Sequence, residues 1–313
     1  MGDIIHALPG VALLKQRFPA AHITWVVEST WVPLFGCNGG LGNGLVDRIV
    51  IFQRDRFSTW DQTKKALRSV HYDLAVDFQG LIKSALIAHF ARPERIVGFG
   101  PAVIREKPAS WFYSTCIQTP SIHVVDQALD LAAGAIGEPR GAGQPALPFP
   151  LPPGAPEGVL PDGPFALACP LAGWTSKQWP LEHYEKLAKM LRERLNMPMV
   201  LNGPPGFMQP VAWAVRHESG VSGLIDATRR AALVIGVDSG PLHLAAALQK
   251  SGAAIFGPTD PARNGPRGGD FQVFRADGVK TTHRRGDAID SSMRAIAPEQ
   301  IFAALAARMN CHA

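Results

Sequence analysis

The chain has 313 residues, of which 46% are hydrophobic and 18% charged, so it is long enough for two domains and too apolar for a disordered protein. A net charge of +5 suits an anionic ligand and is too small to indicate a nucleic-acid-binding protein. No apolar run approaches the roughly 18 residues of a membrane helix, and the start lacks a signal-peptide pattern. Four widely spaced cysteines indicate neither a disulfide framework nor a zinc site, so we expect a cytoplasmic protein.

Short apolar, β-branched segments alternate with helical stretches in the first half of the chain. We expect strands at 23–28, 48–52, 74–78 and 95–99, and helices over 7–18, 60–70 and 80–91. Such alternation is typical of a parallel sheet covered by helices. A doubly wound domain normally opens with a strand, but MGDIIHALPG has no apolar strand before its helix. We therefore expect a natural start about ten residues earlier, with a strand of about five to six residues.

A proline-rich segment separates this half from a second one with the same pattern. The linker is predicted over 146–163, because PALPFPLPPGAPEGVLPDGP has too many prolines for regular structure. Strands then resume at 165–170, 197–203, 231–237 and 253–257, with helices over 180–195, 241–250 and 297–309. We expect an N-terminal domain over 1–145, a second domain over 164–297 and a C-terminal helix over 298–313. In two doubly wound α/β domains, ligands are expected at the carboxyl ends of the strands, in a cleft between the domains.

The strongest single motif is AALVIGVDSGPLHLAAAL, in which a buried strand turns into a helix. Ser239 or Gly240 suits the helix cap, and Pro241 suits the first turn because its missing N–H is not needed there. The free N–H groups of a helix start bind phosphate groups well, and His243 lies one turn further. The alternative is a plain strand–turn–helix corner.

A second loop, GWTSKQWP, follows the strand at 165–170 in the same way. Thr175 and Ser176 supply hydroxyl donors, and Lys177 supplies a mobile positive charge for a diphosphate. A lone lysine in a loop is more often solvent-facing, so the neighbouring motif is what favours a binding role.

Further candidate site residues lie in the first half of the chain. Asp3 is expected in a loop ahead of the first helix, either as a helix cap or as a general base. In DFQGLIKSA, we expect Gln79, Gly80 and Lys83 to be exposed at the ligand edge of the sheet. Residues 48–68 hold six basic and two acidic side chains, which form either a solvated helix face or an anion-binding segment.

Several other motifs fail. There is no D-x-D pair for a metal–nucleotide complex and no phosphate-binding loop of the G-x-x-x-x-G-K-[ST] type. GGLGNG at 39–44 departs from the dinucleotide-binding pattern, and THRRGD at 282–287 offers one histidine without a second ligand. We therefore expect no metal and no cofactor.

Five segments in the right order resemble glycosyltransferase family 9, the lipopolysaccharide heptosyltransferases of inner-core assembly. They are MGDIIHALP, DFQGLIKSA, TSKQWP, VDSGPLHLAAAL and FGPTDP. The resemblance covers nearly the whole chain and implies a GT-B fold, two Rossmann-like domains facing a cleft. DFQGLIKSA and REKPASWFY look most like heptosyltransferase I, with heptosyltransferase II as the near alternative. The resemblance implies metal-independent, inverting transfer of heptose from ADP-heptose to Kdo of lipid A, by a cytoplasmic enzyme at the inner surface of the membrane.

The resemblance also implies roles for individual residues. Asp3 resembles the catalytic base. The donor-binding set comprises Thr175, Ser176, Lys177, Asp238, Ser239, Gly240, Leu242 and His243. The acceptor-binding set comprises Arg54, Arg56, Lys64 and Arg105.

One region departs from the family pattern. Residues 203–231 look about ten residues short and lack the acidic residue expected to hold the ADP ribose, while Glu218 lies too far along to take that role. Two rival classes therefore stay open. One is a sugar-nucleotide-binding protein with impaired catalysis. The other is an epimerase of the UDP-GlcNAc 2-epimerase type, against which DFQGLIKSA and REKPASWFY count.

Overall fold

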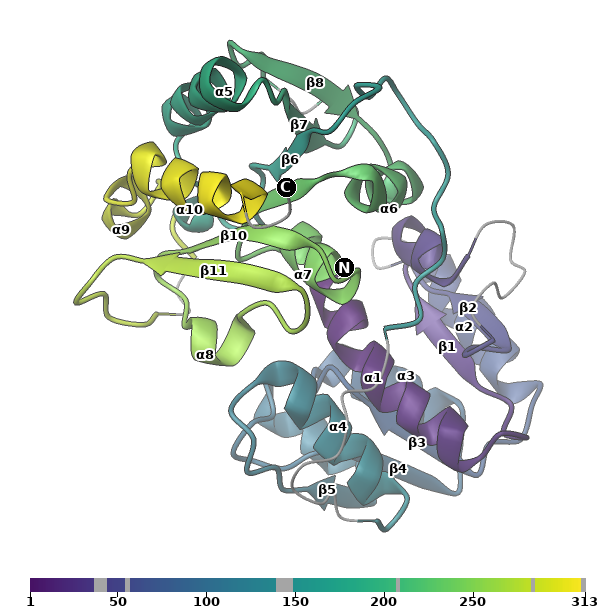
Figure 1. Cartoon of the computed structure of the whole chain (residues 1–313). Coiled ribbons are helices and arrows are strands. Elements are labelled where there is room, and N and C mark those ends of the chain that lie inside the picture. Colours follow the sequence, from purple (N-terminus) through teal and green to yellow (C-terminus); the bar gives the residue numbers. More distant parts are fainter. Residues whose placement is uncertain (37–43, 54–56, 139–148, 207–208, 283–284, 311–313) are drawn as a thin grey trace. The chain divides into compact units, whose positions relative to one another are not determined.

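A computed structural model describes residues 1–36, 44–53, 57–138, 149–206, 209–282 and 285–310. The chain divides into two compact units, Asp3–Pro152 and Pro153–Ala313, with Met1–Gly2 grouped with the second (Figure 1). The boundary lies within the proline-rich segment, of which residues 149–164 form neither helix nor strand. No helix in the described residues is both long and apolar enough to cross a membrane.

The N-terminal unit contains parallel strands covered by helices. Its strands are β1 (Thr24–Val27), β2 (Arg48–Ile51), β3 (Leu74–Asp77), β4 (Arg95–Phe99) and β5 (Thr115–Ile117). Its helices are α1 (Gly2–Arg17), α2 (Phe57–Arg68), α3 (Ile82–Phe90) and α4 (Val124–Ala135), with short 3₁₀ segments η1 (Ser29–Phe35) and η3 (Lys107–Phe112). Strands β1 and β2 form one sheet and β3, β4 and β5 another, so no ladder joins β1 to β3 within the described residues.

The prediction that Asp3 lies in a loop ahead of the first helix is wrong. Helix α1 already begins at Gly2, so Asp3 lies in its first turn. A carboxylate is favourable there because the first N–H groups of a helix lack intrahelical acceptors and carry partial positive charge.

The C-terminal unit holds one continuous six-stranded parallel sheet. Its order is β11–β10–β9–β6–β7–β8. The strands are β6 (Ala166–Cys169), β7 (Met199–Gly203), β8 (Ala214–Glu218), β9 (Leu233–Val237), β10 (Ser251–Phe256) and β11 (Asp270–Arg275). The helices are α5 (Leu181–Leu195), α6 (Val221–Arg230), α7 (Gly240–Ala247), α8 (Pro261–Asn264), α9 (Ser291–Arg294) and α10 (Pro298–Asn310), with the 3₁₀ turn η4 at Thr175–Lys177.

An apolar core fixes the loop that follows β6. Trp179 is buried in the main core of this unit and stacks edge-on against Tyr184 of α5. Its indole N–H donates to the Ile296 carbonyl at 3.0 Å, which satisfies its one polar group. The loop that precedes Trp179, including η4, is therefore anchored at its C-terminal end.

Candidate functional site

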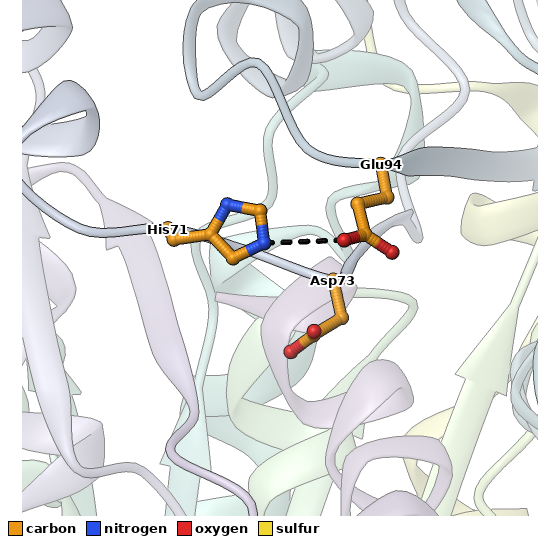
Figure 2. A group of neighbouring side chains, drawn as sticks. All are labelled: His71, Asp73 and Glu94. Carbon is orange, nitrogen blue, oxygen red and sulfur yellow. Dashed lines mark hydrogen bonds and ion pairs between the residues drawn. The ribbon is translucent and has the colours of Figure 1, made fainter.

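The described residues contain one group of three side chains with metal-ligand chemistry, His71, Asp73 and Glu94 (Figure 2). Their ligand atoms lie within 4.8 Å of one another, and all three residues are exposed. Asp73 and Glu94 immediately precede β3 and β4, at the amino ends of these strands. Ligands of parallel sheets bind at the carboxyl ends, so this group is not part of the candidate site.

In the C-terminal unit, a buried ion pair joins the two loops that the sequence singles out. Strands β6 and β9 are neighbours in parallel register, so the loops that follow them leave the same edge of the sheet. Lys177 Nζ lies 2.6 Å from Asp238 Oδ2, and the side chains are 14% and 6% exposed. The ammonium group also lies 4.3 Å from the centroid of the Trp174 ring. Lys177 is therefore a fixed, partly desolvated charge and not a solvent-facing lysine.

The carboxylate of Asp238 is held in its ionised form. Burial raises its pKa, but the hydrogen bond with His243 and the charge of Lys177 lower the pKa more, to well below its usual range. His243 Nε2 lies 3.6 Å from Asp238 Oδ1. Because Lys177 offsets the charge of Asp238, an anionic ligand at this edge does not meet an unpaired carboxylate.

The start of α7 follows directly after this ion pair. Ser239 occupies the N-cap position with extended backbone, and its side chain makes no capping hydrogen bond. Gly240 is the first helical residue, and Leu242 is fully buried and packs against Gly236 of β9. Pro241 has no N–H, and Leu242 and His243 donate theirs to the Ser239 carbonyl, so the N–H groups of Ser239 and Gly240 are the ones that this turn offers to an anion.

Three hydroxyl groups at the carboxyl edge are buried without a hydrogen-bond partner among the described residues. They belong to Ser176, Ser239 and Thr259. Buried hydroxyls are normally paired, so this concentration of unpaired ones beside a lysine and a helix start is typical of a site for a polar ligand. Ser176 and Ser239 are among the donor-binding residues expected from the sequence. Thr259 lies inside FGPTDP, but its type alone gave no reason to choose it.

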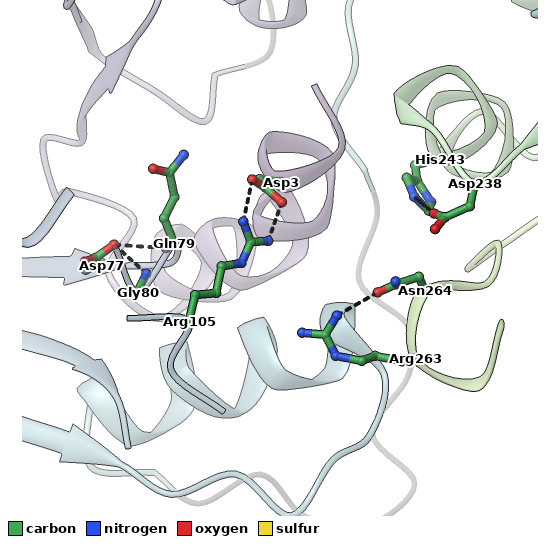
Figure 3. A network of polar contacts seen from close by, with 9 residues as sticks. All are labelled: Asp3, Asp77, Gln79, Gly80, Arg105, Asp238, His243, Arg263 and Asn264. Carbon is green, nitrogen blue, oxygen red and sulfur yellow. Dashed lines mark hydrogen bonds and ion pairs between the residues drawn. The ribbon is translucent and has the colours of Figure 1, made fainter. Parts of the chain in front are cut away.

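In the N-terminal unit, Asp3, the expected base, contacts Arg105, one of the expected acceptor-binding residues (Figure 3). Arg105 donates from Nη1 to Asp3 Oδ2 at 2.9 Å and from Nη2 to Asp3 Oδ1 at 2.5 Å. The hydrogen bonds to Asp3 raise the pKa of Arg105. Partial burial lowers this pKa, but the negative charges of Asp3 and Asp77 raise it further, so that the net shift is upward. Both side chains are about two-fifths exposed, so the pair remains accessible to a ligand.

The segment after β3 is a tight turn held by Asp77. The buried carboxylate accepts hydrogen bonds from the backbone N–H groups of Gln79 at 2.9 Å and Gly80 at 3.2 Å. Gly80 has a φ of +67°, in the left-handed region. The expectation that Gly80 is exposed is wrong, because this turn buries it. Lys83 is also only partly exposed, and its ammonium lies 3.5 Å from Glu28 Oε1.

The structure does not gather the other expected acceptor-binding residues around Arg105. Arg54 and Arg56 lie outside the described residues. Lys64 lies on α2 with its ammonium 5.8 Å from the centroid of the Phe90 ring, and within the described residues no contact joins it to Arg105. GGLGNG and the middle of THRRGD also fall largely on residues that are not described.

The region expected to be shortened has a carboxylate at the ligand edge after all. Strands β7 and β8 pair with Gly203 opposite Glu218, so Glu218 ends its strand at the carboxyl edge of the sheet. Its Oε1 accepts from the Gly206 N–H at 3.2 Å and from Arg216 Nε at 3.1 Å. Sequence distance from Gly203 had suggested that Glu218 is too far along, but the parallel return of β8 brings it back.

A model described as glycosyltransferase family 9 (heptosyltransferase) matches residues 60–206 and 218–290. Lipopolysaccharide heptosyltransferase 1 of Pseudomonas aeruginosa is 26% identical over 302 residues, covering 86% of this chain and 79% of that protein. The protein of the same name from Escherichia coli K12 is 27% identical, with coverages of 88% and 91%. Lipooligosaccharide heptosyltransferase 2 of Haemophilus ducreyi is 23% identical, with coverages of 99% and 97%.

Solved structures of related enzymes share the fold. The E. coli heptosyltransferase WaaC with ADP has a TM-score of 0.75 at 22% identity, covering 100% of this chain and 97% of that one. E. coli ADP-heptose LPS heptosyltransferase II has a TM-score of 0.77 at 21% identity, with coverages of 99% and 96%. The expected GT-B fold is thereby confirmed.

Proposed function

The chain belongs to glycosyltransferase family 9, and we propose that it transfers heptose from ADP-heptose to a Kdo sugar of lipid A in assembly of the lipopolysaccharide inner core. The observation that carries the donor side is the Lys177–Asp238 pair beside the first turn of α7. A charge-neutral pair, a helix start and unpaired hydroxyls together suit a diphosphate better than any neutral ligand.

On the donor side, we assign each residue a task in stabilising the leaving ADP. Lys177 has three N–H donors and uses one of them on Asp238, which leaves donors for a phosphate oxygen. The N–H groups at Ser239 and Gly240 stabilise the negative charge that grows on the diphosphate. Such preorganised stabilisation is usually the largest single contribution to catalysis. Thr175, Ser176 and His243 line the same edge.

On the acceptor side, Asp3 serves as the general base. It takes the proton of a Kdo hydroxyl as that oxygen forms a bond to the anomeric carbon of the heptose, and the bond from that carbon to the diphosphate breaks. Inversion follows from attack on the face opposite the leaving group. Arg105 orients the Asp3 carboxylate through two hydrogen bonds, and its remaining N–H donors suit the carboxylate of an acidic sugar such as Kdo.

Both heptosyltransferase I and heptosyltransferase II activities fit these groups, and relatives of both kinds match the chain. We propose the first because of DFQGLIKSA and REKPASWFY. The lipid acceptor implies that the enzyme works at the cytoplasmic face of the inner membrane. We further propose that transfer needs no metal ion.

One experiment tests the function and separates its alternatives. Release of ADP from ADP-heptose is measured with Kdo₂-lipid A, with lipid A that lacks Kdo, and with heptosyl-Kdo₂-lipid A. Release with the first acceptor alone supports the proposal, whereas release with the third alone identifies a heptosyltransferase II. A catalytically impaired binding protein would bind ADP in a calorimetric titration and release none from ADP-heptose with any acceptor.

A further inference from the structure

We propose that Asp77 is a positioning residue that holds Arg105, and through Arg105 the Asp3 carboxylate, in place for the transfer reaction. The proposal rests on the function proposed above. Asp77 touches neither Asp3 nor the guanidinium of Arg105 through any hydrogen bond among the described residues. It acts through the two segments on which Arg105 rests and through its negative charge, which attracts the guanidinium.

The carboxylate of Asp77 ties three segments together. Oδ1 accepts the two backbone N–H groups of the turn at Gln79 and Gly80, as Figure 3 shows. Oδ2 accepts from the Ser84 hydroxyl at 2.8 Å, in the first turn of α3, and from the Tyr113 hydroxyl at 2.7 Å, immediately after η3. A buried carboxylate with four donors is fully satisfied, and a network of this kind is rigid.

Arg105 lies between two of these tied segments. Glu106 donates its N–H to the Gly80 carbonyl at 3.0 Å, and its Oε2 accepts from the N–H of Ile82 at 2.7 Å. A Cβ on Gly80 would lie 3.3 Å from Arg105 N, so the backbone of Arg105 rests directly on this turn. At the other end, Tyr113 packs against Gly98 of β4, where an added Cβ would overlap its ring at 2.1 Å. The segment from Arg105 to Tyr113 is therefore fixed at both ends by Asp77.

Electrostatics agree with this geometry. Burial together with the charge and hydrogen bond of Asp77 raises the pKa of Tyr113, so the hydroxyl stays a donor. Catalytic groups need placement to about 0.5 Å, and a shift of about 1 Å costs roughly 100-fold in rate, so loosening this support should show in turnover.

The test compares variants of the same network. Asp77→Asn keeps the shape of the side chain, retains an acceptor for the turn and removes the charge, whereas Asp77→Ala would leave four donors unpaired. Tyr113→Phe releases the far end of the Arg105 segment, and Ser84→Ala releases only α3. We expect Asp77→Asn and Tyr113→Phe to raise the acceptor KM and lower kcat by about tenfold, as expected for misplaced rather than missing groups. The donor KM of both should stay near that of the wild type, and Ser84→Ala, which leaves the Tyr113 bond and the turn in place, should change the acceptor KM and kcat clearly less than the other two variants.

A second measurement does not depend on the assigned reaction. The rate at which phenylglyoxal modifies Arg105 is followed by peptide mass mapping, because a bidentate pair with Asp3 protects the guanidinium. Asp77→Asn and Tyr113→Phe should speed this modification several-fold, as should Asp3→Asn, while Ser84→Ala should speed it clearly less. Equal changes in the modification rate of Asp77→Asn, Tyr113→Phe and Ser84→Ala would overturn the positioning role. Protection of Arg105 that persists in Asp77→Asn would overturn it too. Failure of the wild type to release ADP would instead reject the proposed function.

Discussion

Removing Lys177 should destabilise the C-terminal unit more than the loss of a surface lysine would. Lys177→Ala removes the partner of the buried, ionised Asp238, whose side chain is 6% exposed in the wild type, and leaves His243 beside it. Breaking a buried pair from one side costs about 3–5 kcal/mol, a large share of the roughly 5–15 kcal/mol that stabilises a typical protein. For a unit of this size, each kcal/mol corresponds to about 2–4 °C in Tm, so the expected fall is about 6–20 °C.

The assay is urea unfolding with calorimetry, and its control is the double variant Lys177→Ala/Asp238→Asn. The double variant removes the stranded charge and should recover about half of the loss or more, because an unpaired charge is the main penalty. A single variant within about 1 kcal/mol of the wild type would refute the argument, since that is the range of an exposed pair. A double variant as unstable as the single one would refute it too.

The difference in unfolding free energy between the wild type and Lys177→Ala should depend on pH, because the pKa of Asp238 is lowered in the folded wild type. In the wild type, this group adds stability above its unfolded pKa of about 3.9, and that stability is lost as the pH falls through the lower folded value. Without Lys177 a major lowering partner is gone, and burial raises the pKa of Asp238. Protonation of Asp238 removes the unpaired charge in Lys177→Ala and so stabilises this variant. The difference in unfolding free energy between the wild type and the variant should therefore become smaller as the pH falls toward 4.

Three further outcomes concern the reaction. Asp3→Asn should lower kcat by about 10²–10⁴-fold with little change in donor affinity, as expected for loss of a general base, and near-native turnover would remove Asp3 from the mechanism. Arg105→Ala should raise the acceptor KM more than the donor KM, with a smaller effect at high salt, and equal effects on both substrates would mean a structural role. EDTA should leave the transfer rate unchanged, and a loss that Mg²⁺ restores would contradict the metal-free mechanism.

Most strands and helices could be predicted because each is marked by its own residues. VIGVDSGPLHL shows a buried strand, a cap and a helix within eleven residues, and β9 and α7 lie where the pattern predicts them. Strands β5, β8 and β11 are not marked in this way and could not be predicted. β5 has only three residues, and the outward face of the edge strand β8 is polar, with Arg216 exposed. Such strands depend on their neighbours for stability, so local hydrophobicity does not reveal them.

The candidate site also contains residues that the sequence reveals and contacts that it does not. Lys177, Ser239 and His243 were identified because they stand in motifs, and the structure places them at one edge of one sheet. The contact between Lys177 and Asp238 crosses 61 residues and that between Asp3 and Arg105 crosses 102. Residues so far apart in the chain form no local sequence pattern. The sequence therefore indicates all four residues as candidates but does not show that they form ion pairs. Thr259 and Tyr113 were missed for a related reason, because their roles depend on burial.

Asp77 shows how a structural residue and a functional one differ in what the sequence reveals. Its position at the end of an apolar strand is typical of ligand-binding aspartates, yet burial and four hydrogen bonds commit its carboxylate to the protein itself. Asp3, in contrast, lies in MGDIIHALP, and its side chain is about two-fifths exposed. The side chain of Asp3 is about two-fifths exposed and paired with Arg105, so a substrate can reach it, whereas the buried carboxylate of Asp77 acts through the backbone it holds. The chemistry at this end of the N-terminal unit therefore depends on two aspartates whose side chains differ in burial and not in type.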